Sequence, residues 1–370
     1  MKVKEVDHKK WIKAFFRLLK RIYRGDNNFV HPLKIERKEF LDPQKNPFFK
    51  HAEYEFIVAE ENSEPLGVII PFIDKKFNEY HSEKACHFGF FECINDKEVA
   101  HELFQRVYAF ASGKGMEVIR GPFNFSTNHE CGLLVQGFDS PPVVLMTYNP
   151  PYYIDLITSE GYTKAKDLFA FRIDAKPVPD ALVQVCENIK ETTKAETRKM
   201  RKRDFSILVD LVMEIYNDAW SENWGFVPMD REEFVFVARG LRLFLDEDLS
   251  FFVVKDNKPV GFSITLPDYY VPLKEMKGKL FPSGLIKFLV NRRKIKNARI
   301  FALGIKKEFH DKGFAALLYF ETWKTLLEKG YEWAEMSWIL EDNYRMIRAI
   351  ELAGGRVYKV YRIYEKAVEK

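Results

Sequence analysis

Six residues at 310–315 have the types and spacing needed to hold a phosphate group. They read His-Asp-Lys-Gly-Phe-Ala and lie between a strand-like segment, 299–308, and an amphipathic, helix-like one. Gly313 and Ala315 let the backbone come close to a ligand, and the free N–H groups of a helix start donate to an anion. Lys312 adds a positive charge. The alternative is an ordinary helix start that is capped by Asp311.

A polar cluster within 123–153 has the residue types of a substrate-binding loop. Asn128, His129 and Glu130 follow one another there, and Tyr148 and Tyr152 would form the walls. A loop this long inside a compact domain is often functional. The alternative is a set of turn and cap hydrogen bonds made by Asn, Ser and Thr. No third ligand is in view beside His129 and Glu130, so we expect no metal.

The elements that must position these residues are written twice in the chain. Two stretches, EPLGVII at 64–70 and KPVGFSI at 258–264, share one pattern, and Pro65 and Pro259 are 194 positions apart. Gly161 and Gly354 are 193 positions apart, and each is followed by a strand-like stretch that contains an aromatic–Arg–Ile step. The common offset indicates an internal repeat.

Each copy also contains a Gly-containing strand followed by an amphipathic helix and a second strand. The strands are 86–95 and 299–308, the helices end at Gly115 and Gly330, and the second strands are MEVIRG and YEWAEMSWI. Strands that alternate with helices predict an α/β protein with a mixed sheet covered on both faces, each copy closing with a strand pair. The Pro-rich segment 175–180 divides the chain into domains 1–174 and 181–370. Inserts fall at 123–148 and within 267–298.

This order resembles the GNAT-type acyl-CoA N-acyltransferase fold, as two tandem domains over nearly all of the chain. The segments GPFNFSTNHECGLLV, TYNPPYY and YNDAWSENWGFVP are most similar to a bacterial group of tandem GNAT-like proteins without a defined reaction. The resemblance implies acetyl-CoA or another acyl-CoA as cosubstrate and an amine of a small molecule or peptide as acceptor.

The resemblance also implies which half binds the cosubstrate. In the second half the expected contacts are Leu303, Ile305, His310, Lys312, Gly313, Phe314 and Ala315. His310 stands where the family motif has Arg or Gln. The first half has no Gly at 94–99, and Asn95, Asp96 and Glu98 satisfy its helix start, so that half is expected to lack a CoA site.

The catalytic residues implied by the family are only partly present. Many members supply an acid from a Tyr seven residues after an Asn; here Asn343 fits, but Ile350 stands at the Tyr position. Asn343, Tyr344 and Glu335 are the candidates, with Glu335 as a base or, alternatively, an exposed strand residue. Trp224, in the linker 217–234, would line the acceptor pocket or fill the core. A catalytically silent binding protein and an aminoacyl-tRNA-dependent, Fem-like transferase are the alternatives.

Bulk properties limit the partners. A net charge of +4 over 370 residues gives no reason to expect nucleic-acid binding. No signal peptide, membrane-spanning run or CxxC pair is seen, so we expect a cytoplasmic protein with reduced thiols. The basic, apolar insert at 274–297 is expected to be a lid over the thioester site; a membrane-surface contact or a partner helix are the alternatives.

Overall fold

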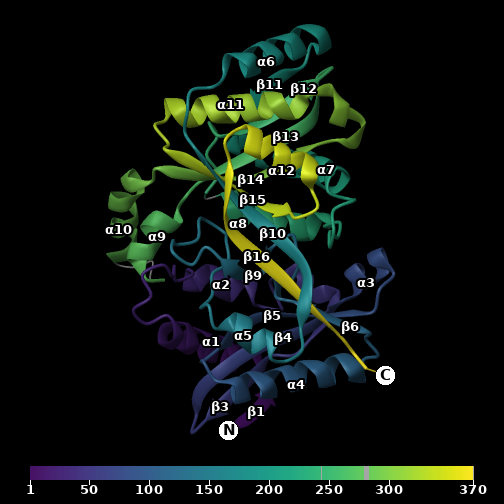
Figure 1. The fold of residues 1–370 in the computed structure, drawn as a ribbon, viewed down its shortest axis with the longest axis vertical. Helices are drawn as coiled ribbons and strands as arrows, with labels where there is room; N and C mark the ends of the chain where they lie inside the picture. Colours follow the sequence, from purple (N-terminus) through teal and green to yellow (C-terminus); the bar gives the residue numbers. More distant parts are fainter. Residues whose placement is uncertain (243, 279–282, 370) are drawn as a thin grey trace.

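The computed structural model describes residues 1–242, 244–278 and 283–369, and most of its strands join one mixed sheet of 14 strands (Figure 1). Residues 1–174 are called the first half below, and 181–370 the second half. The first half contains β1 (Lys2–Glu5), α1 (His8–Ile22), α2 (Lys34–Phe40), η1 (Pro47–Lys50), β2 (Ala52–Tyr54), β3 (Ile57–Glu61), β4 (Glu64–Asp74), α3 (Lys75–His81), β5 (Ala85–Cys93), α4 (Lys97–Gly113), β6 (Val118–Gly121), β7 (Phe123–Asn124), β8 (Glu130–Cys131), β9 (Leu133–Gln136), α5 (Tyr153–Thr158) and β10 (Thr163–Asp174). The second contains α6 (Asp180–Thr193), β11 (Glu196–Lys199), η2 (Lys202–Asp204), α7 (Phe205–Ala219), α8 (Arg231–Arg242), β12 (Ser250–Lys255), β13 (Lys258–Pro267), α9 (Tyr270–Met276), α10 (Ser283–Asn291), η3 (Arg292–Lys294), β14 (Asn297–Ile305), η4 (Lys307–Lys312), α11 (Phe314–Glu328), β15 (Trp333–Leu340), α12 (Tyr344–Leu352) and β16 (Arg356–Ala367).

The last strands of the two halves lie side by side in the middle of the sheet and exchange neighbours (Figure 1). The main order is β1-β3-β4-β5-β6-β16-β10-β15-β14-β13-β12-β11. Strand β10 of the first half pairs with β15 of the second, and β16 pairs with β6 and β9 of the first. The predicted closing strand pair within each half is therefore wrong: each half ends in one long strand. The segment 175–180 separates the two halves along the chain, but it does not divide the sheet. The division into two domains stays a prediction.

Helices cover both faces of the sheet, because side chains of successive strand residues point to opposite faces. In the first half, Val58 packs with α1 on one face, while Ile57 and Ala59 pack with α4 on the other. In the second half, α7 and α11 lie against opposite faces in the same way. The predicted α/β class with a covered mixed sheet is confirmed.

The glycines inside the two Gly-containing strands have a steric reason. A Cβ on Gly89 of β5 would lie 1.7 Å from the carbonyl oxygen of Phe123, and one on Gly304 of β14 would lie 2.2 Å from the Trp220 ring. Both strands are therefore approached so closely by another segment that no side chain fits.

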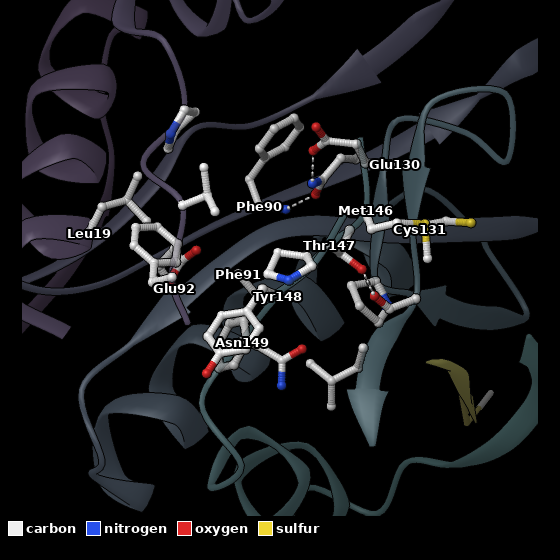
Figure 2. Close-up of a pocket in the computed structure, with 18 of the residues that line it drawn as sticks. Leu19, Phe90, Phe91, Glu92, Glu130, Cys131, Met146, Thr147, Tyr148 and Asn149 are labelled. Atoms are coloured by element: carbon white, nitrogen blue, oxygen red, sulfur yellow. Dashed lines mark hydrogen bonds between the residues drawn. The ribbon is translucent and has the colours of Figure 1, made fainter. Parts of the chain in front are cut away.

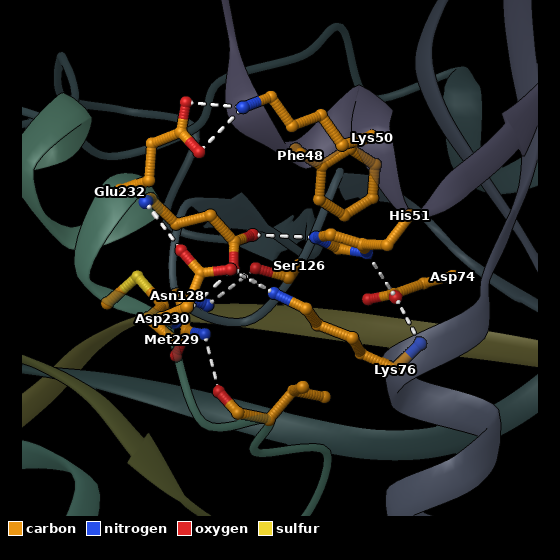
Figure 3. A network of polar contacts seen from close by, with 12 residues as sticks. Phe48, Lys50, His51, Asp74, Lys76, Ser126, Asn128, Met229, Asp230 and Glu232 are labelled. Carbon is orange, nitrogen blue, oxygen red and sulfur yellow. Dashed lines mark hydrogen bonds and ion pairs between the residues drawn. The ribbon is translucent and has the colours of Figure 1, made fainter.

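A polar network ties the first half to α8 of the second (Figure 3). His51 contacts Asp74 through Nδ1 at 2.9 Å and Glu233 through Nε2 at 2.8 Å. Lys76 adds Nζ contacts to Glu233 at 2.7 Å and to Asp230 at 2.6 Å. Burial opposes the charged form of His51, but the hydrogen bonds with Asp74 and Glu233 outweigh it and raise its pKa to about 9.

This network predicts a pH-dependent link between the halves. The folded pKa of His51 lies above the unfolded value of 6.5, so its stabilising effect is full below pH 6.5 and is lost as the pH rises through 9. We expect wild type to exceed His51→Gln in unfolding free energy by about 2 kcal/mol at pH 6, after allowance for solvent screening, and by little at pH 9.5. Urea unfolding at both pH values measures this, with the more exposed His101→Gln as control. A difference that is the same at both pH values would contradict the assignment.

Candidate active site

A cavity of about 120 Å³ opens in the first half where β5 and β6 separate (Figure 2). The two strands pair only from Ala85 to His87 and from Val118 to Arg120. Beyond that point the insert that follows β6 forms one wall, and α1 with the segment after it forms another. The cavity is lined by Phe15, Leu19, Phe29, Val30, Pro32, Arg37, Phe90, Phe91, Glu92, Pro122, Asn124, Glu130, Cys131, Gly132, Leu133, Pro142, Met146, Thr147, Tyr148, Asn149, Tyr153 and Tyr270. The sequence-predicted insert at 123–148 therefore does border a cavity.

Glu92, next to the last residue of β5, brings a carboxyl group to the cavity. It accepts hydrogen bonds from the hydroxyl of Tyr153 at 2.8 Å and from that of Tyr23 at 3.1 Å. Burial raises the pKa of Glu92 to about 7, although the two tyrosine hydrogen bonds and Arg37 favour the ionised form. A carboxyl group that titrates near neutral pH inside a cavity can accept a proton from a ligand and release it again.

A buried ion pair lines the cavity as well. Arg37 donates to Glu130 through Nη1 at 2.9 Å and Nη2 at 2.6 Å, and Asn124 Nδ2 donates to the same carboxylate at 2.9 Å. Burial raises the pKa of Glu130, but Arg37 outweighs it, and the net pKa is lowered. Glu130 lines the cavity as the sequence suggested, yet both of its oxygens are already bound. It is therefore placed to hold the wall rather than to accept a proton.

The other acceptor-site candidates are divided by the structure. Tyr148 lines the cavity and donates to Asp26 at 2.9 Å. His129 contacts Ser126 Oγ at 2.9 Å, and burial lowers its pKa to about 4. Tyr152 donates to the carbonyl of Cys93 at 2.8 Å, and the cationic groups of Arg120 and Lys166 each lie over the ring of Trp224. The last three side chains do not line this cavity.

A second, apolar cavity of about 100 Å³ lies between α7, α8 and strands β13 and β14. Asn128 reaches it from the first-half insert, and its Oδ1 accepts a hydrogen bond from Tyr216 at 2.7 Å. Phe301 and Ala302 of β14 form part of its wall. The remaining lining is Met200, Phe205, Leu208, Val209, Val212, Met229, Phe234, Val237, Ala238, Leu241, Arg242, Leu245, Phe262 and Ile264. Such a lining suits an aliphatic chain.

The start of α11 lacks the side-chain cap that the start of α4 has. Asp96 accepts from the backbone N–H groups of Glu98 and Val99 at the start of α4, as predicted. At α11 the capping position is Gly313, with φ of 74°, and no side-chain cap is formed. Asp311 is 93% exposed and lies in η4, so the alternative that Asp311 caps this helix is wrong.

The remaining residues of the predicted CoA loop differ in their exposure. His310 and Lys312 are exposed, and His310 Nε2 lies 2.9 Å from the carbonyl of Ile305. Leu303 and Ala315 are partly buried, whereas Ile305 and Phe314 lie in the core between β14 and α11. The side chains of Ile305 and Phe314 are thus not available to a ligand.

The three predicted catalytic residues do not form a common site. Glu335 is fully buried, accepts from Ser337 at 2.6 Å and from Tyr358, and lies 3.8 Å from Arg299. Burial raises its pKa. The alternative that Glu335 is an exposed strand residue is wrong. Asn343 caps α12 by accepting from Met346 at 3.2 Å, and Tyr344 is 75% exposed.

Four residues that line this cavity or contact Glu92 were not predicted from the sequence: Glu92, Tyr23, Tyr153 and Arg37. A usable signal existed for Glu92, because it is the one acid in the run ACHFGFFEC, which is apolar apart from Glu92 and His87. An acid in a buried strand must have partners, and this raises the expectation of a site.

Two findings concern the described residues as a whole. Across 1–242, 244–278 and 283–369, no helix combines the length and apolar character needed to cross a membrane. Within the same ranges, no cluster of three or more His, Cys, Asp or Glu side chains is arranged to hold a metal ion.

Two known proteins are similar to this chain in sequence over nearly its whole length. No protein-family model matches the chain. Over 364 residues it is 35% identical to the bacterial ceramide synthase of Caulobacter vibrioides (strain NA1000 / CB15N), covering 96% of this chain and 95% of that protein. Over 366 residues it is 32% identical to protein YghO of Escherichia coli (strain K12), covering 96% and 93%.

Solved structures show the same fold at low identity. A tandem GNAT protein from the clavulanic acid biosynthesis pathway superposes with a TM-score of 0.60 at 10% identity, covering 100% of this chain and 99% of that one. A GCN5-related N-acetyltransferase from Sphaerobacter thermophilus gives 0.53 at 12% identity, covering 100% and 96%. The chain therefore belongs to the family of tandem GNAT-like proteins that includes the Caulobacter ceramide synthase and YghO.

Proposed function

We propose that the protein is an N-acyltransferase that moves an acyl group from acyl-CoA to the amine of an amphiphilic, long-chain molecule. The GNAT fold supports acyl transfer. A relative that is 35% identical over nearly its whole length is named a ceramide synthase, and a ceramide is the amide of a fatty acid and a long-chain amine. The observation that carries the proposal is the Glu92 cavity, in which a titratable acid and the Arg37–Glu130 ion pair stand beside apolar walls.

The cavity lining fits an amphiphilic amine. Phe15, Leu19, Phe29 and Val30 offer an apolar wall to an aliphatic chain, and Glu92 offers a carboxyl group to an ammonium group. Contact with the ammonium stabilises the ionised carboxylate, so the pair forms readily near neutral pH. The apolar cavity beside β14 is suited to the acyl chain of the donor.

The proposed reaction needs one base. Glu92 takes one proton from the ammonium group, and the freed amine nitrogen forms a bond to the thioester carbonyl carbon. The carbon–sulfur bond then breaks, and the second proton of the nitrogen passes to the CoA thiolate, directly or through water. The products are an amide and CoA thiol, and Glu92 releases its proton to water before the next turnover. A thiol has a pKa of about 8.5, so the thiolate leaves near neutral pH without a dedicated acid. The buried Ile350 at the family's usual Tyr position is thus compatible with turnover. Acyl-CoA is a cytoplasmic cosubstrate, so the proposed reaction is cytoplasmic.

The test is an assay with acyl-CoA of several chain lengths and three amines: sphinganine, a short alkylamine and a lysine-containing peptide. We expect sphinganine to give an amide by mass spectrometry and an equal amount of free thiol, with little product from the peptide. Binding of both ligands without amide would favour the catalytically silent alternative. Product from the peptide alone would contradict the lipid acceptor.

The start of α11 supports a CoA site at Lys312–Ala315, and charge reversal there tests it. In Lys312→Glu/Ala315→Glu, two carboxylates at the helix start repel a pyrophosphate, while the helix itself is favoured by acids in its first turn. For wild type we expect CoA at a hundred times its dissociation constant to raise the unfolding free energy by about 2.7 kcal/mol, and for the variant almost none.

The matched control for that change is Lys97→Glu at the start of α4, where Asp96 already caps the helix. Its CoA-induced shift in thermal unfolding should equal that of wild type. A shift that persists in the α11 variant, or that is lost in Lys97→Glu, would move the CoA site out of the second half.

A further inference from the structure

Helix α10 carries an apolar face that no part of the described chain covers. Leu285, Ile286, Leu289 and Val290 are 41%, 66%, 47% and 61% exposed. Positions one, two, five and six of such a run fall on one side of a helix, so the four side chains form a continuous stripe. A stripe of four large aliphatic residues is unusual on a free surface and marks a contact site.

Positive charge predominates around the stripe, although the exposed Glu275 of α9 lies beside Lys287, whose Nζ donates to its carbonyl at 3.3 Å. From residue 276 to residue 307 the sequence has no Asp or Glu and ten Lys and Arg. Of these, Lys287 lies on α10 itself, and Arg292, Arg293 and Lys294 follow directly in η3; all four are exposed. Among the described residues, Arg292, Arg293 and Lys294 form no ion pair, so their charge is available to a partner. Residues 279–282, including the basic and apolar part of this insert at Lys279–Phe281, lie outside the described residues.

The opposite side of α10 packs against residues that also line the Glu92 cavity. Phe288 stacks on Tyr269 at 5.8 Å between ring centroids and packs in one apolar cluster with Val30, Leu273 and Met276. Val30 and its neighbour in that cluster, Tyr270, also line the cavity. In Figure 1, α9 and α10 stand together at the left edge of the protein. The insert joins β14 at Asn297, and the 310–315 loop follows the other end of that strand. This placement does not support the expected lid over the 310–315 loop.

We propose that α10 docks the protein on an anionic lipid bilayer. The aliphatic stripe enters the interfacial region, and Lys287, Arg292, Arg293 and Lys294 contact anionic headgroups. The apolar cluster that Phe288 of α10 shares with Val30 and Tyr270 then holds the cavity close to the bilayer. Docking does not require the proposed acyl transfer; only the further step, entry of a lipid amine from the bilayer into the cavity, rests on it.

Vesicle co-sedimentation of the full chain tests the docking. Wild type should bind vesicles of phosphatidylcholine with 30 mol% phosphatidylglycerol far more than pure phosphatidylcholine, and salt should weaken the binding. Ile286→Glu/Val290→Glu should reduce binding about tenfold or more, and so should Arg292→Gln/Arg293→Gln/Lys294→Gln. The control is Leu352→Glu, which places the same acid at an 80% exposed apolar site on α12. Thermal unfolding confirms that each variant is folded, and all positions are exposed.

Three results would overturn the proposal. Wild type could fail to bind anionic vesicles, the α10 variants could bind as wild type does, or Leu352→Glu could lose binding equally. A dimer, seen by light scattering, that Ile286→Glu/Val290→Glu dissociates, with no vesicle binding, would make a second copy the occupant. The failure of docking is separable from the failure of the proposed function, because acylation of a micellar amine in detergent is independent of α10.

Discussion

Glu92→Gln is expected to lower kcat for amide formation by about a hundredfold or more, because a positioned base contributes roughly 10²–10⁴ in rate. The change keeps the size of the side chain and an oxygen that Tyr153 and Tyr23 can donate to, but it removes the proton acceptor. In wild type, kcat/KM should rise with pH through about 7, where Glu92 of the free enzyme ionises. That limb should be missing in the variant. Steady-state assays from pH 5.5 to 8.5 measure both effects.

Glu335→Gln is the matched control, since Glu335 is also buried and also accepts from a tyrosine, yet does not line the cavity. Its kcat should stay within a few-fold of wild type. The reverse outcome, with Glu335→Gln inactive and Glu92→Gln active, would make Glu335 the base, as the sequence suggested.

Stability separates lost catalysis from lost folding in Glu92→Gln. The pKa of Glu92 is raised by burial from 4.5 to about 7, so the stability it contributes is present below pH 4.5 and lost as the pH rises through 7. The loss is on the order of 3 kcal/mol at most, because Glu92 is only partly buried from solvent. Glu92→Gln should therefore be at least as stable as wild type at pH 8. A variant that is unfolded at pH 8 would contradict this picture.

The second large effect is expected for Arg37→Met, which should lower the unfolding free energy by about 3–5 kcal/mol. The guanidinium group holds the buried carboxylate of Glu130 with two hydrogen bonds and lies over the rings of Phe40 and Phe90. Its removal leaves the charge of Glu130, whose side chain is only 18% exposed, with Asn124 as its remaining partner. Urea unfolding at pH 7 gives the difference.

The double variant Arg37→Met/Glu130→Gln should recover much of that loss, because a neutral pair of similar volume carries no uncompensated charge. Arg17→Met is the surface control. Its partner Glu64 is well exposed, so the cost should be under about 1 kcal/mol. A single variant that costs no more than Arg17→Met, or a double variant no better than the single, would show that the pair does not hold the cavity wall.

The features that could be predicted from the sequence rest on local signals. Val99, Leu103 and Val107 recur at helical spacing and are buried in α4, and Gly115 and Gly330 end their helices with φ of 69° and 74°. The capping of α4 by Asp96 is local as well. Such signals depend on neighbours a few residues away, which the sequence displays directly.

Local sequence signals do not show which strands pair with β10 and β16. Leu168 of β10 lies opposite Leu340 on one side and Tyr361 on the other. The aromatic–Arg–Ile stretches have the same β propensity whichever strand lies beside them. The exchange between the halves is therefore decided by packing over more than 170 positions of chain.

The sequence by itself determined the fold family, the alternation of strands and helices, and the Asp96 cap at the start of α4. Tertiary structure alone decided that Glu92 is an acid near neutral pH and that the insert, α1 and β5 enclose a cavity. The reason is that the pKa of Glu92 depends on burial and on hydroxyl groups of Tyr23 and Tyr153, 69 and 61 positions away. Burial and hydrogen-bond partners arise only when distant segments meet, so no local pattern encodes them.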